Sequence, residues 1–235
     1  MSDRSRPDPI GHRWQPVSDV FPIFINLVRA SWRQLLAIWG LVTGGVLTLS
    51  SVLAALPVPP LVFLGVTPAI LPVAFGSAMA AHRLLWPSAP RLAACADVAM
   101  RAFIPLLVVI AMRQVLMQLG FSMLVLPGLA AAVFLLLAPV VVMAEGPGLQ
   151  NAFQRSATLI LPIGWAVLGL LFLSALSGLL LLVPIALVAV PLAALGEGTL
   201  EAFVEAGATA AFPLAFTTMG VAIYLYVTGA GETRH

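Results

Sequence analysis

The chain alternates between long apolar runs and short segments in which polar side chains recur at helical spacing. The stretch 126–161 shows this unit most clearly. A proline-glycine pair opens its apolar run, a proline interrupts it and a glutamate ends it. A Gly-Pro-Gly break then leads into a short amphipathic segment with an arginine-serine pair, and the next apolar run follows at once. In order, these motif residues are Pro127, Gly128, Pro139, Glu145, Arg155 and Ser156. The pattern predicts membrane-spanning helices joined by connectors that lie in the membrane interface.

The apolar runs set the number of spans. Because a spanning helix needs about 20 residues, the chain has room for about six spans. We place them at 35–56, 61–81, 102–119, 124–144, 159–182 and 207–227. The expected fold is therefore an all-α, polytopic integral membrane protein with about six transmembrane helices in one domain over 18–230. Residues 1–17 and 231–235 are expected to be cytoplasmic tails. The run 184–195 is either re-entrant, interfacial or a tilted extension of the fifth span.

Polar residues at helical spacing identify two further segments. In 17–33 they alternate with apolar positions, which predicts a first amphipathic connector. The first span follows it, and Pro57, Pro59 and Pro60 predict a tight turn after that span. Three glutamates at i, i+4 and i+8, Glu197, Glu201 and Glu205, predict a short acidic helix on the outer side. Near the end of the chain, Tyr224 and Tyr226 are typical of an interfacial aromatic belt.

The basic residues indicate the orientation. They gather before the first span, in the loop that follows the second span and in the connector before the fifth. The interfacial basic residues are Arg29, Arg33, His82, Arg83 and Arg101, with His82 interpreted as part of the positive charge. By the positive-inside rule, these segments and both termini face the cytoplasm. We expect a multi-pass protein of the bacterial inner membrane.

Composition limits the classes of function. Hydrophobic residues make up 61% of the chain and charged residues 9%, and the mean hydropathy is +1.09. This leaves too little polar surface for a soluble domain. The formal net charge is +2, and the basic residues form no cluster in the sequence. Nucleic acid is therefore not an expected partner. The single cysteine, Cys95, has no Cys or His neighbours in the sequence, and we expect neither a metal nor a cofactor.

The motif residues together carry a resemblance to a known family. The order Pro-Gly, Pro, Glu and Arg-Ser before another span resembles the central motif of the membrane proteins related to the membrane domain of glycerophosphodiester phosphodiesterases. The resemblance implies a bundle of six helices. It does not imply the phosphodiesterase chemistry, because that belongs to a soluble barrel that this chain lacks. The sequence departs from the family's pattern at Ala157, Thr158 and Leu159, where the family has Trp and a basic residue.

Arg113 is the sharpest candidate for a binding residue. It stands inside the third span and is followed by Gln114 and Gln118. An arginine in hydrocarbon is costly, so it is normally paired, faces a cavity or snorkels. No acidic residue lies in another span to pair with it. Outward snorkelling past the two glutamines, or plain hydrogen bonding to facing carbonyls, is the favoured interpretation. The alternative is that Arg113 holds a lipid phosphate or an anionic substrate.

A second candidate pair lies at the cytoplasmic boundary. Glu145 and Arg155 are separated by the Gly-Pro-Gly break, and we expect an ion pair that fixes the connector against the fourth span. No serine or histidine accompanies them in a nucleophile-base arrangement, and no paired carboxylates or phosphate-binding loop occur. The sequence thus predicts that the protein is not an enzyme.

These observations favour one function and leave two alternatives. The favoured function is a non-enzymatic membrane protein that organises or stabilises lipid, or a membrane complex, through its bundle and its arginine-bearing connectors. One alternative is a small transporter or permease for a lipid-like or anionic solute, with a site near Arg113. The other is an accessory subunit or homo-oligomer that docks through the glycine-rich first span, where Gly40 and Gly44 form a small-xxx-small motif.

Overall fold

The computed structural model describes residues 11–55, 69–87, 92–123, 125–146, 148–174, 176 and 197–229. The secondary structure in these ranges is helical, and they contain no strand. Within them, five helical stretches are long and apolar enough to cross a membrane by length and composition, and a sixth apolar helix, Ile70–Leu85, is shorter. The predicted all-α, polytopic membrane fold is confirmed.

The helices follow the predicted order, although several are longer than expected. They are α1 (Gly11–Ala55), α2 (Ile70–Leu85), α3 (Leu92–Met123), α4 (Val125–Phe134), α5 (Ala138–Glu145), α6 (Leu149–Ile160), the 3-10 turn η2 (Leu161–Ile163) and α8 (Glu197–Val227). Residues 164–174 are also helical. The predicted proline turn at 57–60 and the segment 184–195 lie outside the described residues, as do most of the two tails.

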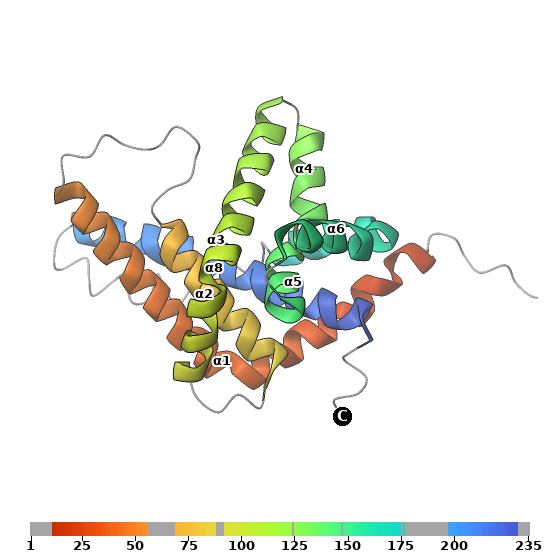
Figure 1. The fold of residues 1–235 in the computed structure, drawn as a ribbon, viewed down its shortest axis with the longest axis horizontal. Coiled ribbons are helices and arrows are strands. Elements are labelled where there is room, and N and C mark those ends of the chain that lie inside the picture. The colour runs from red at the N-terminus through yellow and green to blue at the C-terminus, as the bar shows by residue number, and fades with distance from the viewer. Residues whose placement is uncertain are drawn as a thin grey trace, which may run out of the picture.

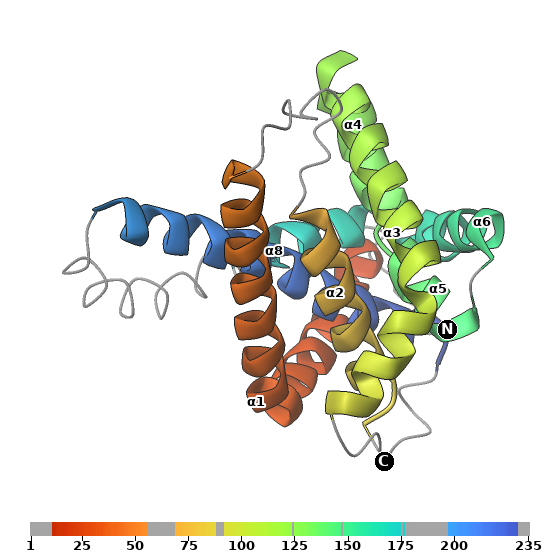
Figure 2. The same ribbon diagram turned by 60° about the vertical axis from the view of Figure 1, so that its left-hand side comes forward.

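The first connector and the first span form one helix. We predicted separate elements at 17–33 and 35–56, but α1 runs through both without a break. The physical reason is that no proline or glycine separates Ile23 from Trp39, so nothing ends the helix between the amphipathic and the apolar part. Figures 1 and 2 show that α1 bends, so that its two parts run in different directions. Its start at Gly11 makes the end of the predicted tail helical.

The core centres on α2, which packs against α1, α3, α5 and α8. Small residues line its buried part and let the neighbouring helices approach closely: Ala74, Gly76, Ser77, Ala78, Ala80 and Ala81. Gly76 lies directly against α1, because a Cβ at this position would be 2.1 Å from Cγ2 of Val42. The following helix, α3, begins at Leu92, so it takes in residues 92–101, most of which we had predicted as loop.

α3 and α4 form a hairpin that stands out from the body in both views (Figures 1 and 2). Their backbones meet at two glycines, because a Cβ on Gly120 would lie 2.5 Å from the amide nitrogen of Gly128. The fourth span is then interrupted, as predicted from Pro139. A turn at 135–137 separates α4 from α5, and Pro139 lies in the first turn of α5, where the missing N–H is tolerated.

The last helix, α8, crosses the molecule and packs against α1, α2 and α5 (Figure 1). We expected the acidic residues to form a short separate helix and the last span to begin at 207. Instead, Glu197 begins α8 and the helix continues to Val227. Gly207 costs a helix only about 1 kcal/mol relative to alanine, which is not enough to break it. The indole N–H of Trp39 donates to the carbonyl oxygen of Gly207 at 3.0 Å and joins α1 to α8.

Candidate functional site

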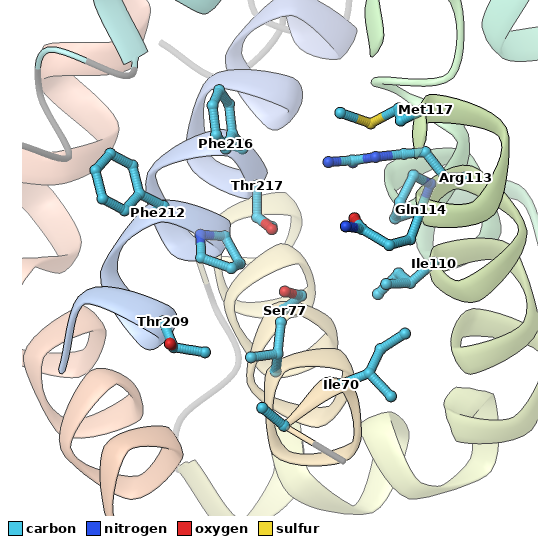
Figure 3. Close-up of a pocket in the computed structure, with 14 residues that line it drawn as sticks. Ile70, Ser77, Ile110, Arg113, Gln114, Met117, Thr209, Phe212, Phe216 and Thr217 are labelled. Carbon is cyan, nitrogen blue, oxygen red and sulfur yellow. The ribbon is translucent and has the colours of Figure 1, made fainter. Parts of the chain in front are cut away.

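α2, α3 and α8 frame a pocket of about 320 Å³, and Pro139 of α5 completes its wall (Figure 3). Most of the lining is apolar. The polar lining residues are Ser77 of α2, Arg113 and Gln114 of α3, and Thr209 and Thr217 of α8. A mostly apolar pocket of this size with a few convergent polar groups is the usual form of a small-molecule site.

The helical repeat of α3 places Arg113 in this pocket. The lining residues of α3 are Ile110, Arg113, Gln114 and Met117, which follow the i, i+3, i+4, i+7 spacing of one helix face. Figure 3 shows the Arg113 side chain pointing from α3 towards Phe216 and Thr217 of α8. Arg113 thus faces this pocket, and whether it snorkels or holds an anionic ligand stays a prediction. Of the two predicted glutamines, only Gln114 lines the pocket.

The Arg113 guanidinium has no protein counter-ion in the described part of the chain. None of the hydrogen bonds or ion pairs formed among those residues involves it, and it is the one charged side chain among the described residues that line the pocket. An arginine within a membrane-spanning helix needs a partner, because an unpaired charge in an apolar environment is strongly unfavourable. The pocket therefore presents an unmatched positive charge to whatever enters it.

α8 supplies the opposite wall, which the sequence reasoning missed. Thr209, Phe212, Pro213, Phe216 and Thr217 share one face of this helix. Pro213 has no N–H, so α8 lacks the usual helical hydrogen bond to the carbonyl of Thr209. The i, i+3, i+4, i+7, i+8 spacing of these residues was visible in the sequence, but only the position of α2 and α3 shows that this face lines a pocket.

The motif residues of the fourth span hold three helices together at one end of α8. Nε of Arg155 lies 3.3 Å from Oε1 of Glu145, so the predicted ion pair is present. The Tyr224 hydroxyl donates to the same carboxylate oxygen at 3.0 Å. Ser156, which is fully buried, donates through its hydroxyl to the carbonyl oxygen of Phe134 at 2.7 Å. Glu145 is therefore a junction between α5, α6 and α8.

The two residues that open the motif have a packing role. Pro127 is exposed in the first turn of α4, whereas Gly128 is buried against Gly120 and Phe121 of α3. The proline fits the start of a helix, where its missing N–H costs no hydrogen bond, and the glycine lets the hairpin close.

The predicted interfacial basic residues lie on three helices. Arg29, Arg33 and Arg101 are exposed, and the Arg33 guanidinium lies 5.4 Å from the ring centre of Trp32. Arg83 donates a hydrogen bond to the carbonyl oxygen of Pro87. Burial lowers the pKa of the His82 imidazole, and its ring centre lies 4.9 Å from that of Trp86. The lowered pKa disfavours the charged form of His82, and its interpretation as part of the interfacial positive charge stays a prediction.

The described residues contain no cluster of three His, Cys, Asp or Glu side chains that could hold a metal. Comparison of the chain with protein-family models, curated proteins and solved structures found no match. The resemblance to the membrane domain of glycerophosphodiester phosphodiesterases stays a prediction. The site must therefore be interpreted from its own geometry, which is a half-buried guanidinium facing an apolar pocket between three helices.

Proposed function

We propose that this protein is a non-enzymatic integral membrane protein that binds an anionic membrane lipid in the pocket between α2, α3 and α8, and so organises lipid around its bundle. The observation that carries the proposal is the Arg113 guanidinium, which points into the pocket and forms no ion pair with any described residue. A phosphate group is a suitable partner, because the planar guanidinium matches two phosphate oxygens at once.

The apolar lining supports a lipid as the ligand. Phe212, Phe216, Ile70 and Met117 surround the polar groups (Figure 3). A small polar anion has no apolar part to place against this lining, whereas an acyl chain would fill it through van der Waals packing, the interaction that drives association within a membrane. The combination of one cation and an apolar wall fits an amphiphile.

We further propose that the protein lies in the bacterial inner membrane with both termini in the cytoplasm. The Tyr226 hydroxyl donates to a carboxylate oxygen of Asp19 at 3.4 Å, so the end of α8 and the early part of α1 lie together. Two segments that meet in this way are on one side of a membrane. The arginines near the start of the chain favour the cytoplasmic side.

Native mass spectrometry of protein released in a mild detergent tests lipid binding. We expect the wild-type protein to retain phospholipid and Arg113→Leu to lose it. Arg101→Leu is the matched control, because it makes the same change on the same helix at an exposed position. Equal retention by all three proteins would show that the lipid is not held by Arg113 and would refute the proposal. Loss in both variants would indicate lipid held at the surface by general charge.

A transporter for a lipid-like or anionic solute is a second candidate, and the interrupted fourth span favours it. Pro139 lines the pocket, and it lies just after the turn at 135–137 that separates α4 from α5. Discontinuous helices next to a binding site are typical of transporters, in which they move between two arrangements.

Reconstituted vesicles with a fluorescent anionic lipid in one leaflet test this candidate. Movement between leaflets that requires Arg113 would support transport, and retention without movement would support the lipid-organising function.

A further inference from the structure

We infer that the ligand of this pocket carries a single negative charge and a hydroxylated head group without an amine, as phosphatidylglycerol does. This inference rests on the proposed function, because it names the class of lipid that the Arg113 pocket selects. It separates three phospholipid classes that share a phosphate: phosphodiesters with a hydroxylated head group, zwitterions with an ammonium group, and phosphomonoesters with up to two negative charges.

The charge of the pocket limits the charge of its ligand. In the described part of the chain, Arg113 is the one charged side chain that lines the pocket. One guanidinium compensates one negative charge. A phosphomonoester that carries a second negative charge would leave that charge without a partner in a mostly apolar pocket, which is strongly unfavourable. The pocket therefore favours a phosphodiester.

The carboxylates of α5 and α8 lie away from Arg113. In a zwitterionic lipid the ammonium group is only two carbons from the phosphodiester, so a carboxylate would have to lie beside Arg113. On α8 the nearest glutamate with a described side chain is Glu205, twelve residues before Thr217 and thus about 18 Å away along the helix axis. On α5, Glu145 lies six residues beyond Pro139, about 9 Å along the axis, and its Oε1 already accepts from Arg155 and Tyr224. Beside Arg113, an ammonium group would therefore have no carboxylate as counter-ion among the described residues.

The uncharged polar groups of the pocket suit hydroxyl groups on the ligand. Ser77, Thr209 and Thr217 carry hydroxyls, and Gln114 carries an amide, so each of them both donates and accepts hydrogen bonds. Pro213 leaves the carbonyl of Thr209 without its usual helical donor. Groups that accept as well as donate suit the hydroxyls of a glycerol head group, which need both kinds of partner.

A competition experiment tests the selectivity. Delipidated protein is mixed with vesicles that hold equal amounts of phosphatidylglycerol, phosphatidylethanolamine and phosphatidic acid with the same acyl chains, and the lipids retained are measured by native mass spectrometry. We expect phosphatidylglycerol to be retained about tenfold over each of the others, a factor that corresponds to about 1.4 kcal/mol. Arg113→Lys, which keeps the charge, is expected to keep this order, whereas Arg113→Gln is expected to lose it.

The outcomes separate this inference from the proposed function. Equal retention of the three lipids that is lost in Arg113→Gln would overturn the selectivity but leave lipid binding at Arg113 intact. Retention that is unchanged in Arg113→Gln would overturn both. Glycerophosphoglycerol, the head group without acyl chains, is added in a separate arm. Displacement of the lipid by an equal concentration of this soluble compound would show that the ligand is the free anion and would overturn the lipid as its source.

Discussion

The hydroxyl of Ser156 on α6 donates a hydrogen bond of 2.7 Å to the carbonyl oxygen of Phe134, the last residue of α4. This carbonyl lies at the interruption of the fourth span, where the turn at 135–137 replaces regular helix. Inside a membrane an unpaired carbonyl is costly, because no water is present to pair with it. Ser156 of the connector therefore has a structural function, which is to bind the end of α4 where the fourth span is interrupted.

Removing this hydroxyl should destabilise the protein. We expect Ser156→Ala to lower the free energy of unfolding by about 1–3 kcal/mol, because it leaves the Phe134 carbonyl unpaired in a partly buried position. Unfolding of the purified protein by increasing denaturant in detergent measures the change. Thr158→Ala is the control on the same helix, since Thr158 is exposed and bonds only the carbonyl of Arg155. Equal losses in the two variants would show that the contact with Phe134 has no special weight.

The two partners of Glu145 should differ in their contribution to stability. The Arg155 side chain is 46% exposed, so its ion pair with Glu145 is expected to contribute at most about 1 kcal/mol. The Tyr224 hydroxyl reaches the same oxygen from a distant part of the chain, and its hydrogen bond to a charged group is expected to contribute about 1.5–3 kcal/mol. Tyr224→Phe should thus lower the unfolding free energy more than Arg155→Gln. The reverse order would mean that the ion pair holds the connector.

Acid should weaken the end of α2 through His82. Burial lowers the folded-state pKa of this imidazole below the unfolded value of about 6.5, so the unfolded chain binds more protons on acidification. Stability is therefore expected to fall as the pH drops through about 6.5 and to recover as the pH rises. The thermal unfolding midpoint, measured between pH 8 and pH 5, tests this expectation. His82→Phe keeps a ring beside Trp86 and should flatten the profile; an unchanged profile would locate the acid sensitivity elsewhere.

Local signals in the sequence predicted more of the fold than of the site. The end of the fourth span at Glu145 and its break near Pro139 follow from desolvation of a charge and from the missing N–H of proline, which act within one helix turn. The pocket depends on three helices that are distant in the sequence. The direction of Arg113 was not predictable because α3 is apolar on nearly all sides, so its sequence has no polar face to indicate which side meets α2 and α8.

The glycines divide into two groups with opposite expectations. A Cβ at Gly120 would lie 2.5 Å from the backbone nitrogen of Gly128, and backbone atoms move less easily than side chains. We expect Gly120→Ala to destabilise the hairpin of α3 and α4 by about 1–3 kcal/mol. Gly164→Ala is the control, because nothing lies within 4 Å of its added Cβ and alanine favours helix. Unfolding in detergent measures both variants, and a neutral Gly120→Ala would contradict the close approach of the two helices.

Gly40 and Gly44 of α1 should be dispensable for the fold. Each is exposed, and an added Cβ at either position would have no atom within 4 Å, so this small-xxx-small motif packs against no described part of the chain. Gly40→Leu and Gly44→Leu together are therefore expected to leave the unfolding midpoint unchanged.

The effect of these two substitutions on assembly is a separate question, because small exposed residues on a membrane helix suit a second helix. If the protein docks a partner or a second copy here, the double variant should lose it on size-exclusion chromatography in mild detergent while the fold stays intact. A partner retained in full by the folded double variant would rule out this face as the docking surface.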